Sequence, residues 1–147
     1  MAAKEILGLR DWRLSDRHRL YGPCYMSDID FLVAEYTNCQ PKALVEYKHC
    51  NFSAVNTLLD NPGVRVVQSL ADRASLPAWT AIYDPDSWVF KVFAVNAAAR
   101  AIIGSQVYFT EVEYVCLLHQ IRGATPGPEI LAALNSTTNP IEPDGTD

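Results

Sequence analysis

Two neighbouring apolar segments that carry charged residues at alternating positions constrain the fold of this chain more than any other feature. Residues 26–36 and 42–49 are rich in β-branched, aromatic and aliphatic side chains, which is typical of β-strands. Residues 37–41, Thr-Asn-Cys-Gln-Pro, have the composition of a turn. Two strands joined by such a short turn predict an antiparallel β-hairpin.

The alternation of side chains along each predicted strand collects charged residues on one face of the hairpin. Successive side chains point to opposite faces, so Asp28 shares a face with Asp30, and Glu46 shares a face with Lys48. If the turn centres on Asn38, residues whose numbers sum to 76 lie opposite each other, which pairs Asp30 with Glu46. Directly opposed side chains have Cβ atoms about 4.5–5.5 Å apart. The hairpin therefore predicts two adjacent carboxylates, with a lysine one pleat further along.

The pairing of Asp30 with Glu46 indicates a cation site. Two carboxylates this close repel each other unless a proton or a cation lies between them. Mg²⁺ suits the arrangement, since it takes oxygen ligands and is usually held by one or two carboxylates together with phosphate oxygens of a substrate. Beside such an ion, Lys48 can orient or deprotonate a water molecule, or stabilise charge on a reacting phosphate. Burying these charged groups in an apolar hairpin is costly unless they face a cleft or a metal.

The rest of the chain predicts helices and strands that complete one α/β domain. A chain of 147 residues fits a single domain and buries about two-thirds of its unfolded surface. The periodicity predicts a partly helical segment over 2–20, a helix over 66–75, strands over 79–83 and 88–95, and a helix over 111–121. Residues 97–103 fit either a short helix or an irregular segment. This order predicts a mixed β-sheet flanked by helices, in a domain over residues 1–135. Residues 136–147 are rich in Ser, Thr, Pro and acidic residues, and they predict a disordered acidic tail.

With these elements in place, the hairpin resembles the core of the PD-(D/E)xK nucleases, the restriction-endonuclease-like superfamily. Asp30 matches the first acid of that motif, and the run Glu46-Tyr47-Lys48 matches its second half. The strand over 79–83, which follows a helix, matches the third core strand of the fold. The chain is also similar to small phage and prophage proteins in three segments: 16–22, 28–31 and 46–48. The resemblance covers roughly residues 11–122, most of the chain.

The resemblance implies a restriction-endonuclease-like fold and hydrolysis of DNA phosphodiester bonds with Mg²⁺ or Mn²⁺ as cofactor. In that scheme Asp30 and Glu46 are metal ligands, and the backbone carbonyl of Tyr47 is a further ligand. Lys48 positions or activates the attacking water. Gln68 lies on the helix where members of the superfamily often place a glutamine near the site, so it is carried over as a catalytic residue. The function that the resemblance favours is that of a structure-selective phage endonuclease. It would act on duplex, branched or single-stranded DNA, as a homodimer that cuts both strands.

Charge alone does not identify the partner. The net charge is −5, which is not typical of a nucleic-acid-binding protein, although residues 136–147 carry three acidic residues and no basic one. Basic residues cluster early in the chain, as Arg17, His18 and Arg19. Arginine suits bidentate recognition of phosphate, so this cluster predicts contacts with the nucleic-acid backbone. It is equally consistent with the solvated end of a helix.

Each of these assignments has an alternative that the sequence leaves open. Asp30, Glu46 and Lys48 also fit a surface salt bridge, which contributes about 0.2–1 kcal/mol. Asp28 either replaces or assists Asp30 as a metal ligand, or simply marks the entry into the strand. Gln68 also fits an exposed helix position. Instead of a nuclease, the same fold is consistent with a catalytically silent nucleic-acid-binding protein or a phage accessory protein that binds a host protein.

The sequence also predicts where the protein acts. No apolar run reaches the roughly 18 residues of a membrane helix. The N-terminal residues lack the apolar core of a signal peptide. We therefore expect a cytoplasmic protein with no membrane partner.

Overall fold

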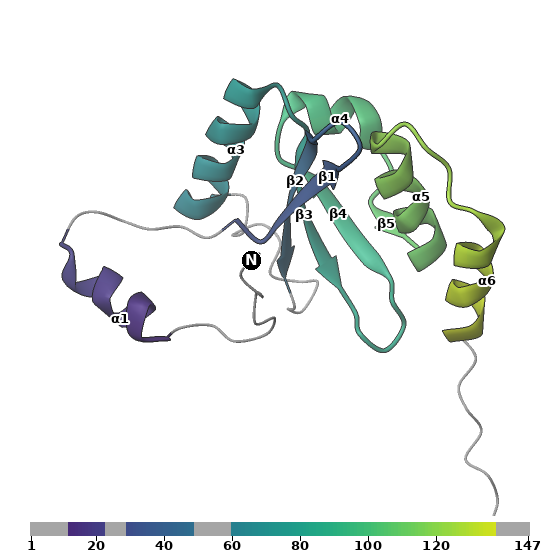
Figure 1. Cartoon of the computed structure of the whole chain (residues 1–147), viewed down its shortest axis with the longest axis horizontal. Helices are drawn as coiled ribbons and strands as arrows, with labels where there is room; N and C mark the ends of the chain where they lie inside the picture. The colour runs from purple at the N-terminus through teal and green to yellow at the C-terminus, as the bar shows by residue number, and fades with distance from the viewer. Residues whose placement is uncertain (1–11, 23–28, 49–59, 138–147) are drawn as a thin grey trace, which may run out of the picture.

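Helices flank a five-stranded mixed sheet in the computed structural model, which describes residues 12–22, 29–48 and 60–137 (Figure 1). The strands are β1 (Phe31–Glu35), β2 (Gln40–Lys48), β3 (Ala78–Tyr83), β4 (Phe90–Ala94) and β5 (Tyr108–Phe109). The helices are α1 (Trp12–Leu20), α3 (Pro62–Ala74), α4 (Ala97–Ile103), α5 (Glu111–Ile121) and α6 (Pro128–Thr137). The strands lie in the sheet in chain order, so β1 and β5 form its edges. The α/β class predicted from the sequence is confirmed.

The β1–β2 hairpin has the register that the sequence predicts. The opposed pairs are Phe31 with Val45, Leu32 with Leu44, and Val33 with Ala43, so the numbers of each pair sum to 76. Beyond Val33 a bulge shifts the register by one residue before the turn over 36–39. Within the turn, the carboxylate of Glu35 accepts hydrogen bonds from the backbone N–H groups of Asn38 and Thr37, at 2.9 and 2.7 Å. These bonds, chiefly the one from Asn38, hold the pKa of Glu35 below its usual value.

The first strand begins later than predicted. Residues 26–28 lie outside the described part of the chain, and Ile29 and Asp30 precede β1 without joining its ladder. The side chain of Asp30 explains this boundary. Its Oδ2 accepts the hydrogen bond of the Tyr47 N–H at 3.1 Å, so a carboxylate takes the place of a backbone carbonyl at this end of the hairpin.

Helix α3 connects β2 to β3, which run parallel. A parallel pair needs a long crossover connection, and here the crossover places a helix across one face of the sheet. The sequence predicted that this helix begins at residue 66, which is wrong. The side chain of Asn61 accepts a hydrogen bond from the Gly63 N–H at 2.8 Å, and Pro62 occupies the first helical position. Asparagine at the cap and proline at the first position both favour a helix start, so the segment read as a loop is the first turn of α3.

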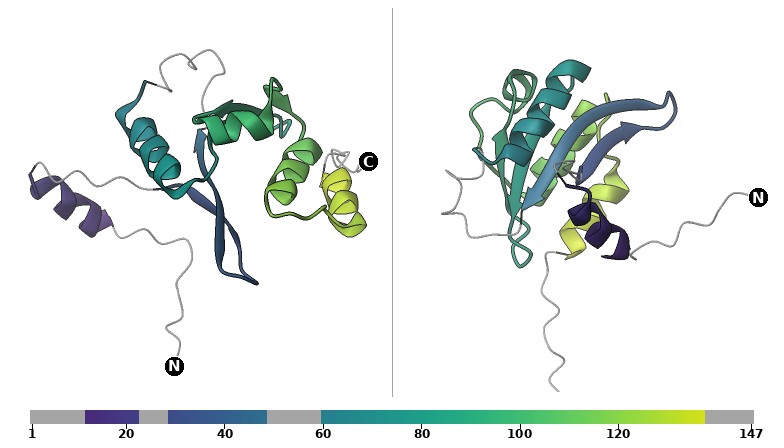
Figure 2. Two further views of the ribbon diagram at one scale, coloured as in Figure 1. Left: turned by 90° about the horizontal axis from the view of Figure 1, so that it is seen from above. Right: turned by 90° about the vertical axis from the view of Figure 1, so that its left-hand side faces the viewer.

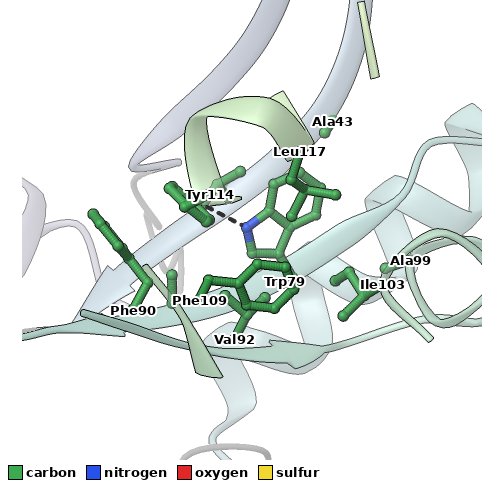
Figure 3. Close-up of a cluster of buried hydrophobic side chains, with 11 residues drawn as sticks. Ala43, Trp79, Phe90, Val92, Ala99, Ile103, Phe109, Tyr114 and Leu117 are labelled. Atoms are coloured by element: carbon green, nitrogen blue, oxygen red, sulfur yellow. Dashed lines mark hydrogen bonds between the residues drawn. The ribbon is translucent and has the colours of Figure 1, made fainter. Parts of the chain in front are cut away.

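The two faces of the sheet are covered by different helices (Figure 2). On one face Leu44 and Ala78 pack with Val64 and Ala71 of α3. On the other face a larger cluster surrounds Trp79, which is buried (Figure 3). Helices α4 and α5 supply its covering side chains, among them Ala99, Ile103, Tyr114 and Leu117. The sheet is therefore the middle layer of three.

A single buried amide, that of Asn96, joins three elements of the fold. Its Oδ1 accepts hydrogen bonds from the N–H of Ala78, where β3 begins, and from the N–H of Ala99 in the first turn of α4. Its Nδ2 donates to the carbonyl of Leu76 and to the carboxylate of Asp72, beyond and within the last turn of α3. The four distances lie between 2.8 and 3.1 Å. Asn96 therefore caps α4 and fixes α3 against β3 at the same time.

The C-terminal part of the chain agrees with the sequence in two helices and differs in two elements. The helix predicted over 111–121 is confirmed as α5, whose capping box is formed by Thr110 and Glu113, and of the two alternatives for 97–103 the structure shows the helix, α4. The strand β5 was not predicted, because two residues are too few to show a period. The helix α6 was not predicted either, and it extends to Thr137, two residues into the segment predicted as a tail. Residues 138–147 lie outside the described part of the chain.

Helix α1 lies away from the strands in both figures that show it (Figures 1 and 2). It confirms the predicted helical segment from Trp12 to Leu20, whereas residues 1–11 lie outside the described part. Across the described residues, no helix combines the length and the apolar character needed to cross a membrane.

Replacing Asn96 by alanine should destabilise the protein by about 3 kcal/mol, because the buried Ala78 N–H and Leu76 carbonyl lose their shared partner. Urea unfolding measures the change. Asn61→Ala is the matched control, since Asn61 caps α3 but is exposed and should cost only about 1 kcal/mol. Equal costs for the two variants would contradict the joining role of Asn96.

Replacing Ser75 by glycine should stabilise the protein by about 0.5–1 kcal/mol. Ser75 ends α3 in the left-handed region, with φ 56° and ψ 39°, where a side chain is strained and glycine is not. The midpoint of thermal unfolding reports the gain. Ser75→Ala should give no such gain, because alanine keeps the strained Cβ; a rise of the same size in both variants would rule out backbone strain as the cause.

Candidate functional site

Asp30 lies at the open end of the hairpin, one residue before β1. Extending the observed register by one residue places it opposite Glu46. Its hydrogen bond from the Tyr47 N–H, at 3.1 Å, holds the carboxylate against the peptide that joins Glu46 to Tyr47. Asp30 is exposed, so this carboxylate is open to solvent and to a ligand. The two acids are therefore neighbours across the hairpin.

Glu46 and Lys48 share one face of β2 and form an ion pair. The Lys48 ammonium contacts Oε1 of Glu46, and the side chains are 36% and 18% exposed for Lys48 and Glu46 respectively. Residues two apart on a strand are separated by about 6.6 Å, so the long lysine side chain folds back to reach the carboxylate. An ion pair this accessible to water contributes about 0.2–1 kcal/mol to stability. The arrangement keeps a cationic group beside the acid pair at little energetic cost.

Thr80 adds a polar group to this face that the sequence analysis missed. It lies beside Glu46 in the parallel register of β2 and β3, so the two side chains point to the same side of the sheet. Thr80 is 1% exposed, and its hydroxyl has no hydrogen-bond partner among the described residues. The signal in the sequence is a single hydroxyl residue within the apolar strand 78–82. Thr80 can be assigned to the face of Glu46 only from the parallel register of β2 and β3, which the sequence does not reveal.

Gln68 lies on the side of α3 that faces the sheet. It follows Val64 by one turn and precedes Ala71 by three residues, and both of these are buried against the strands. Gln68 itself is half-buried. The helix therefore brings this amide to the same face of the sheet as Glu46 and Thr80.

The acid pair at the hairpin end has the capacity to hold a metal ion. Within the described residues no three His, Cys, Asp or Glu side chains gather as a metal-binding group. Mg²⁺ does not need such a group, because it is commonly bound through one or two carboxylates and completes its shell with water and substrate phosphate. An ionised carboxylate offers about four acceptor positions. Among the described residues, the contacts of Asp30 with the Tyr47 N–H and of Glu46 with Lys48 leave oxygen positions for an ion, and the donor set fits Mg²⁺ or Mn²⁺.

The side chain of Tyr47 points to the opposite face of the sheet from Glu46 and Lys48. Its hydroxyl shares a hydrogen bond of 2.7 Å with the hydroxyl of Tyr114, which also accepts a bond from the Trp79 indole N–H at 3.1 Å (Figure 3). Burial raises the pKa of Tyr114 far above its usual value, and the neighbouring Tyr47 raises it further. Burial also raises the pKa of Tyr47. This network anchors β2, the strand that carries Glu46 and Lys48, to α5.

The remaining predicted residues are not brought to the hairpin. Arg17, His18 and Arg19 form the last turn of α1, which lies away from the strands (Figure 1). Arg19 pairs with Asp16 at 3.1 Å on an exposed surface, and the ring of His18 lies 5.6 Å from that of Tyr21. Asp28 lies outside the described residues.

The chain was compared with protein-family models, curated proteins and solved structures. No protein-family model, no curated protein and no solved structure matches the chain.

Raising the pH above 10 should unfold the protein partly through Tyr47 and Tyr114. Both have a raised pKa in the fold, so above pH 10 the unfolded chain releases protons that the folded chain keeps. Their stabilising contribution is complete below pH 10 and is lost as pH rises, by about 1.4 kcal/mol per pH unit for each tyrosine. Urea unfolding between pH 9 and about pH 11 measures this slope.

The double variant Tyr47→Phe with Tyr114→Phe should have a shallower slope, even though it is less stable at neutral pH because the Trp79 N–H loses its acceptor. Tyr36→Phe is the control, since Tyr36 is 86% exposed. An unchanged slope in the double variant would show that the two hydroxyls do not govern alkaline unfolding.

Proposed function

We propose that this chain is a metal-dependent nuclease that hydrolyses DNA phosphodiester bonds at the open end of the β1–β2 hairpin. The observation that carries the proposal is the hydrogen bond from the Tyr47 N–H to Asp30, which holds this carboxylate against the strand on which Glu46 and Lys48 share one face. A second feature supports it. β3 follows α3 and runs parallel to β2, which is the position of the third core strand in the restriction-endonuclease-like fold that the sequence resembles.

In the proposed site Asp30 and Glu46 hold Mg²⁺ or Mn²⁺, and the Tyr47 carbonyl and Asp28 are the further candidate ligands. When bound, such an ion polarises the phosphate and lowers the pKa of a coordinated water. The hydrogen bond from the Tyr47 N–H keeps the Asp30 carboxylate in place before any ligand arrives. A site whose ligands are already oriented loses less entropy on binding, so this bond favours metal affinity.

Lys48 and Gln68 act on the water and the phosphate. Lys48, which contacts Glu46, would lie beside a metal ion held at that carboxylate, where its ammonium could stabilise the attacking water or a phosphate oxygen. Gln68 contributes an amide from α3 on the same side of the sheet, where it can orient that water. Lys48 and Gln68 are thus both catalytic residues in this scheme.

The substrate in this proposal is DNA, either duplex, branched or single-stranded. We propose a structure-selective endonuclease of phage type that cuts both strands as a homodimer. Arg17, His18 and Arg19 would contact the phosphate backbone from α1. A cytoplasmic location and the lack of a membrane partner belong to the same proposal.

One observation favours a second candidate, a protein without catalysis that binds nucleic acid or a host protein on the same fold. The edge strand β1 and the residues before it expose large apolar side chains: Ile29 is 47% exposed, Phe31 58% and Leu32 53%. Natural proteins usually protect such an edge with charges or proline, and an unprotected one is a ready surface for a partner. The acid pair remains the stronger argument, because this candidate gives it no role.

The proposal predicts cleavage of branched, single-stranded or duplex DNA in the presence of Mg²⁺ or Mn²⁺, and its loss in three variants. Asp30→Asn, Glu46→Gln and Lys48→Ala should each reduce the rate by at least about a hundredfold. The two amide variants keep an acceptor for the Tyr47 N–H and for Lys48, so they remove metal-binding charge without breaking these contacts. Gel-based cleavage assays on labelled oligonucleotides measure the rates.

Asp86→Asn is the matched control, because it removes an exposed carboxylate in the turn between β3 and β4 and should leave the rate unchanged. Circular dichroism checks that each variant folds. If folded wild-type protein cuts no substrate with either metal, or if Glu46→Gln cuts as fast as wild type, the nuclease is ruled out and the second candidate takes its place.

A further inference from the structure

A groove of about 710 Å³ opens on the face of the sheet opposite to Glu46 and Lys48, between β1, the turn that joins β3 to β4, and α5. Six aromatic residues line it: Phe31, Tyr47, Tyr83, Trp88, Phe90 and Tyr114. We call it the aromatic groove. Aliphatic side chains of β1 and α5, among them Val33, Val115 and Leu118, complete the lining, and the rings offer flat surfaces to a ligand that is itself planar.

The rings form a continuous array with a buried floor and exposed ends. Phe90 and Tyr114 stack with ring centroids 4.3 Å apart and form the floor. Tyr83 and Trp88 lie parallel, with an interplanar angle of 6°. At the ends, Phe31 is 58% exposed and Trp88 is 39% exposed, so both offer ring surface to solvent.

The backbone at Trp88 is held in a conformation that a bulky side chain rarely adopts. Its φ is +52°, in the left-handed region where glycine is favoured. The N–H of Trp88 donates to the Asp84 carbonyl at 2.8 Å, which fixes this turn. Residues in strained conformations gather at ligand-binding sites, and the turn held in this conformation places Trp88 in the lining of the groove.

Two charged residues, one at each end of α5, give the groove a polarity. Glu111, at the first position of the helix, has a carboxylate oxygen that is buried and without a hydrogen-bond partner among the described residues. Arg122, which also lines the groove, follows Glu111 by eleven positions, or about 16 Å along a helix. At one end of the groove the carboxylate of Glu111 therefore lacks a hydrogen-bond donor, and at the other end lies the guanidinium group of Arg122.

We propose that the aromatic groove binds unpaired bases of a DNA strand, with cytosine preferred beside Glu111; the assignment of DNA as the ligand rests on the proposed function. Bases stack on Trp88 and Phe31, the cytosine N4 amino group donates to the unpartnered oxygen of Glu111, and Arg122 meets a phosphate. Glutamate is a known acceptor for cytosine N4, whereas thymine presents a carbonyl at the corresponding position.

The hydrogen-bonding capacity of Glu111 distinguishes this ligand from others that aromatic surfaces attract. An apolar peptide side chain would cover the carboxylate oxygen and leave it unpaired, which is costly. A quaternary ammonium group would stack on the rings but has no N–H to donate. A nucleobase supplies both the planar face and the donor, and the phosphate that follows it matches Arg122.

The groove also adjoins the candidate metal site through the chain itself. Tyr47, in its wall, lies between Glu46 and Lys48 in sequence, and Phe31 follows Asp30 directly. A strand whose bases occupy the groove therefore reaches the acid pair by passing around the edge strand β1. This geometry makes a single-stranded segment next to the scissile phosphate the preferred substrate.

Binding of fluorescein-labelled dC and dT octamers in EDTA, measured by anisotropy, tests the groove without any metal or cutting. Wild type should bind the dC octamer more tightly than the dT octamer. Trp88→Gly should weaken both by roughly tenfold, because it removes a stacking ring while glycine suits the backbone of the turn. Glu111→Gln should remove the preference for dC, since an amide can also donate to thymine O4.

Tyr36→Ala is the control, because it removes an exposed aromatic ring outside the groove and should leave binding unchanged. Arg122→Ala should lower the logarithmic salt dependence of binding by about 0.7. Octamers that do not bind, or that bind Trp88→Gly and Glu111→Gln as they bind wild type, overturn the groove proposal and leave DNA cutting through Glu46 intact. Octamer binding that follows these variants, in a protein that cuts nothing with Mg²⁺ or Mn²⁺, supports the groove and refutes the nuclease.

Discussion

The structure depends on the buried amide of Asn96 more than on any apolar contact. The hydrophobic effect favours helices packed on both faces of the sheet. Because it has little directionality, it does not fix the position of a helix end relative to a strand. The four hydrogen bonds of Asn96 supply that direction, since they join the end of α3, the start of β3 and the first turn of α4 at fixed distances. The strand β3, which pairs with the site-bearing strand β2, begins at this amide.

Much of the fold was predictable because the signals were local. The register of the hairpin follows from the position of its turn, and the helices α4 and α5 follow from periodicity and caps, as Thr110 and Glu113 illustrate. The wrong helix boundary arose where the same residues are typical of two different structures. The segment Asn61-Pro62-Gly63 has the composition of a turn, yet asparagine and proline also begin helices, and only packing of Val64 against the strands decides between them. β5 pairs with β4 through two residues and has no local signal at all.

The residues of the candidate site also divide into those predicted from local patterns and those that only the structure reveals. Asp30, Glu46 and Lys48 were found from alternation along two adjacent strands, which is a local pattern. Thr80 and the aromatic groove were not found, because each depends on partners distant in sequence. Thr80 gains its place from the parallel register with Glu46, and the groove gathers Phe31, Trp88 and Glu111 from three separate parts of the chain. From the sequence, Trp88 is most simply a core aromatic, with stacking on unpaired bases the less favoured interpretation, and only the structure shows its positive φ and its exposed ring.

The parallel pairing of β2 with β3 also sets the order in which the molecule is assembled. The β1–β2 hairpin joins near neighbours in sequence, and hairpins form within about 1–10 μs. Leu44 and Ala78, in contrast, are 34 positions apart, so β3 can dock only after the intervening chain has closed into a loop and α3 has folded across it. During that interval the apolar edge of β2 is unpaired. The same strand that carries the charged residues is thus the one through which a nascent chain is most exposed to misassociation.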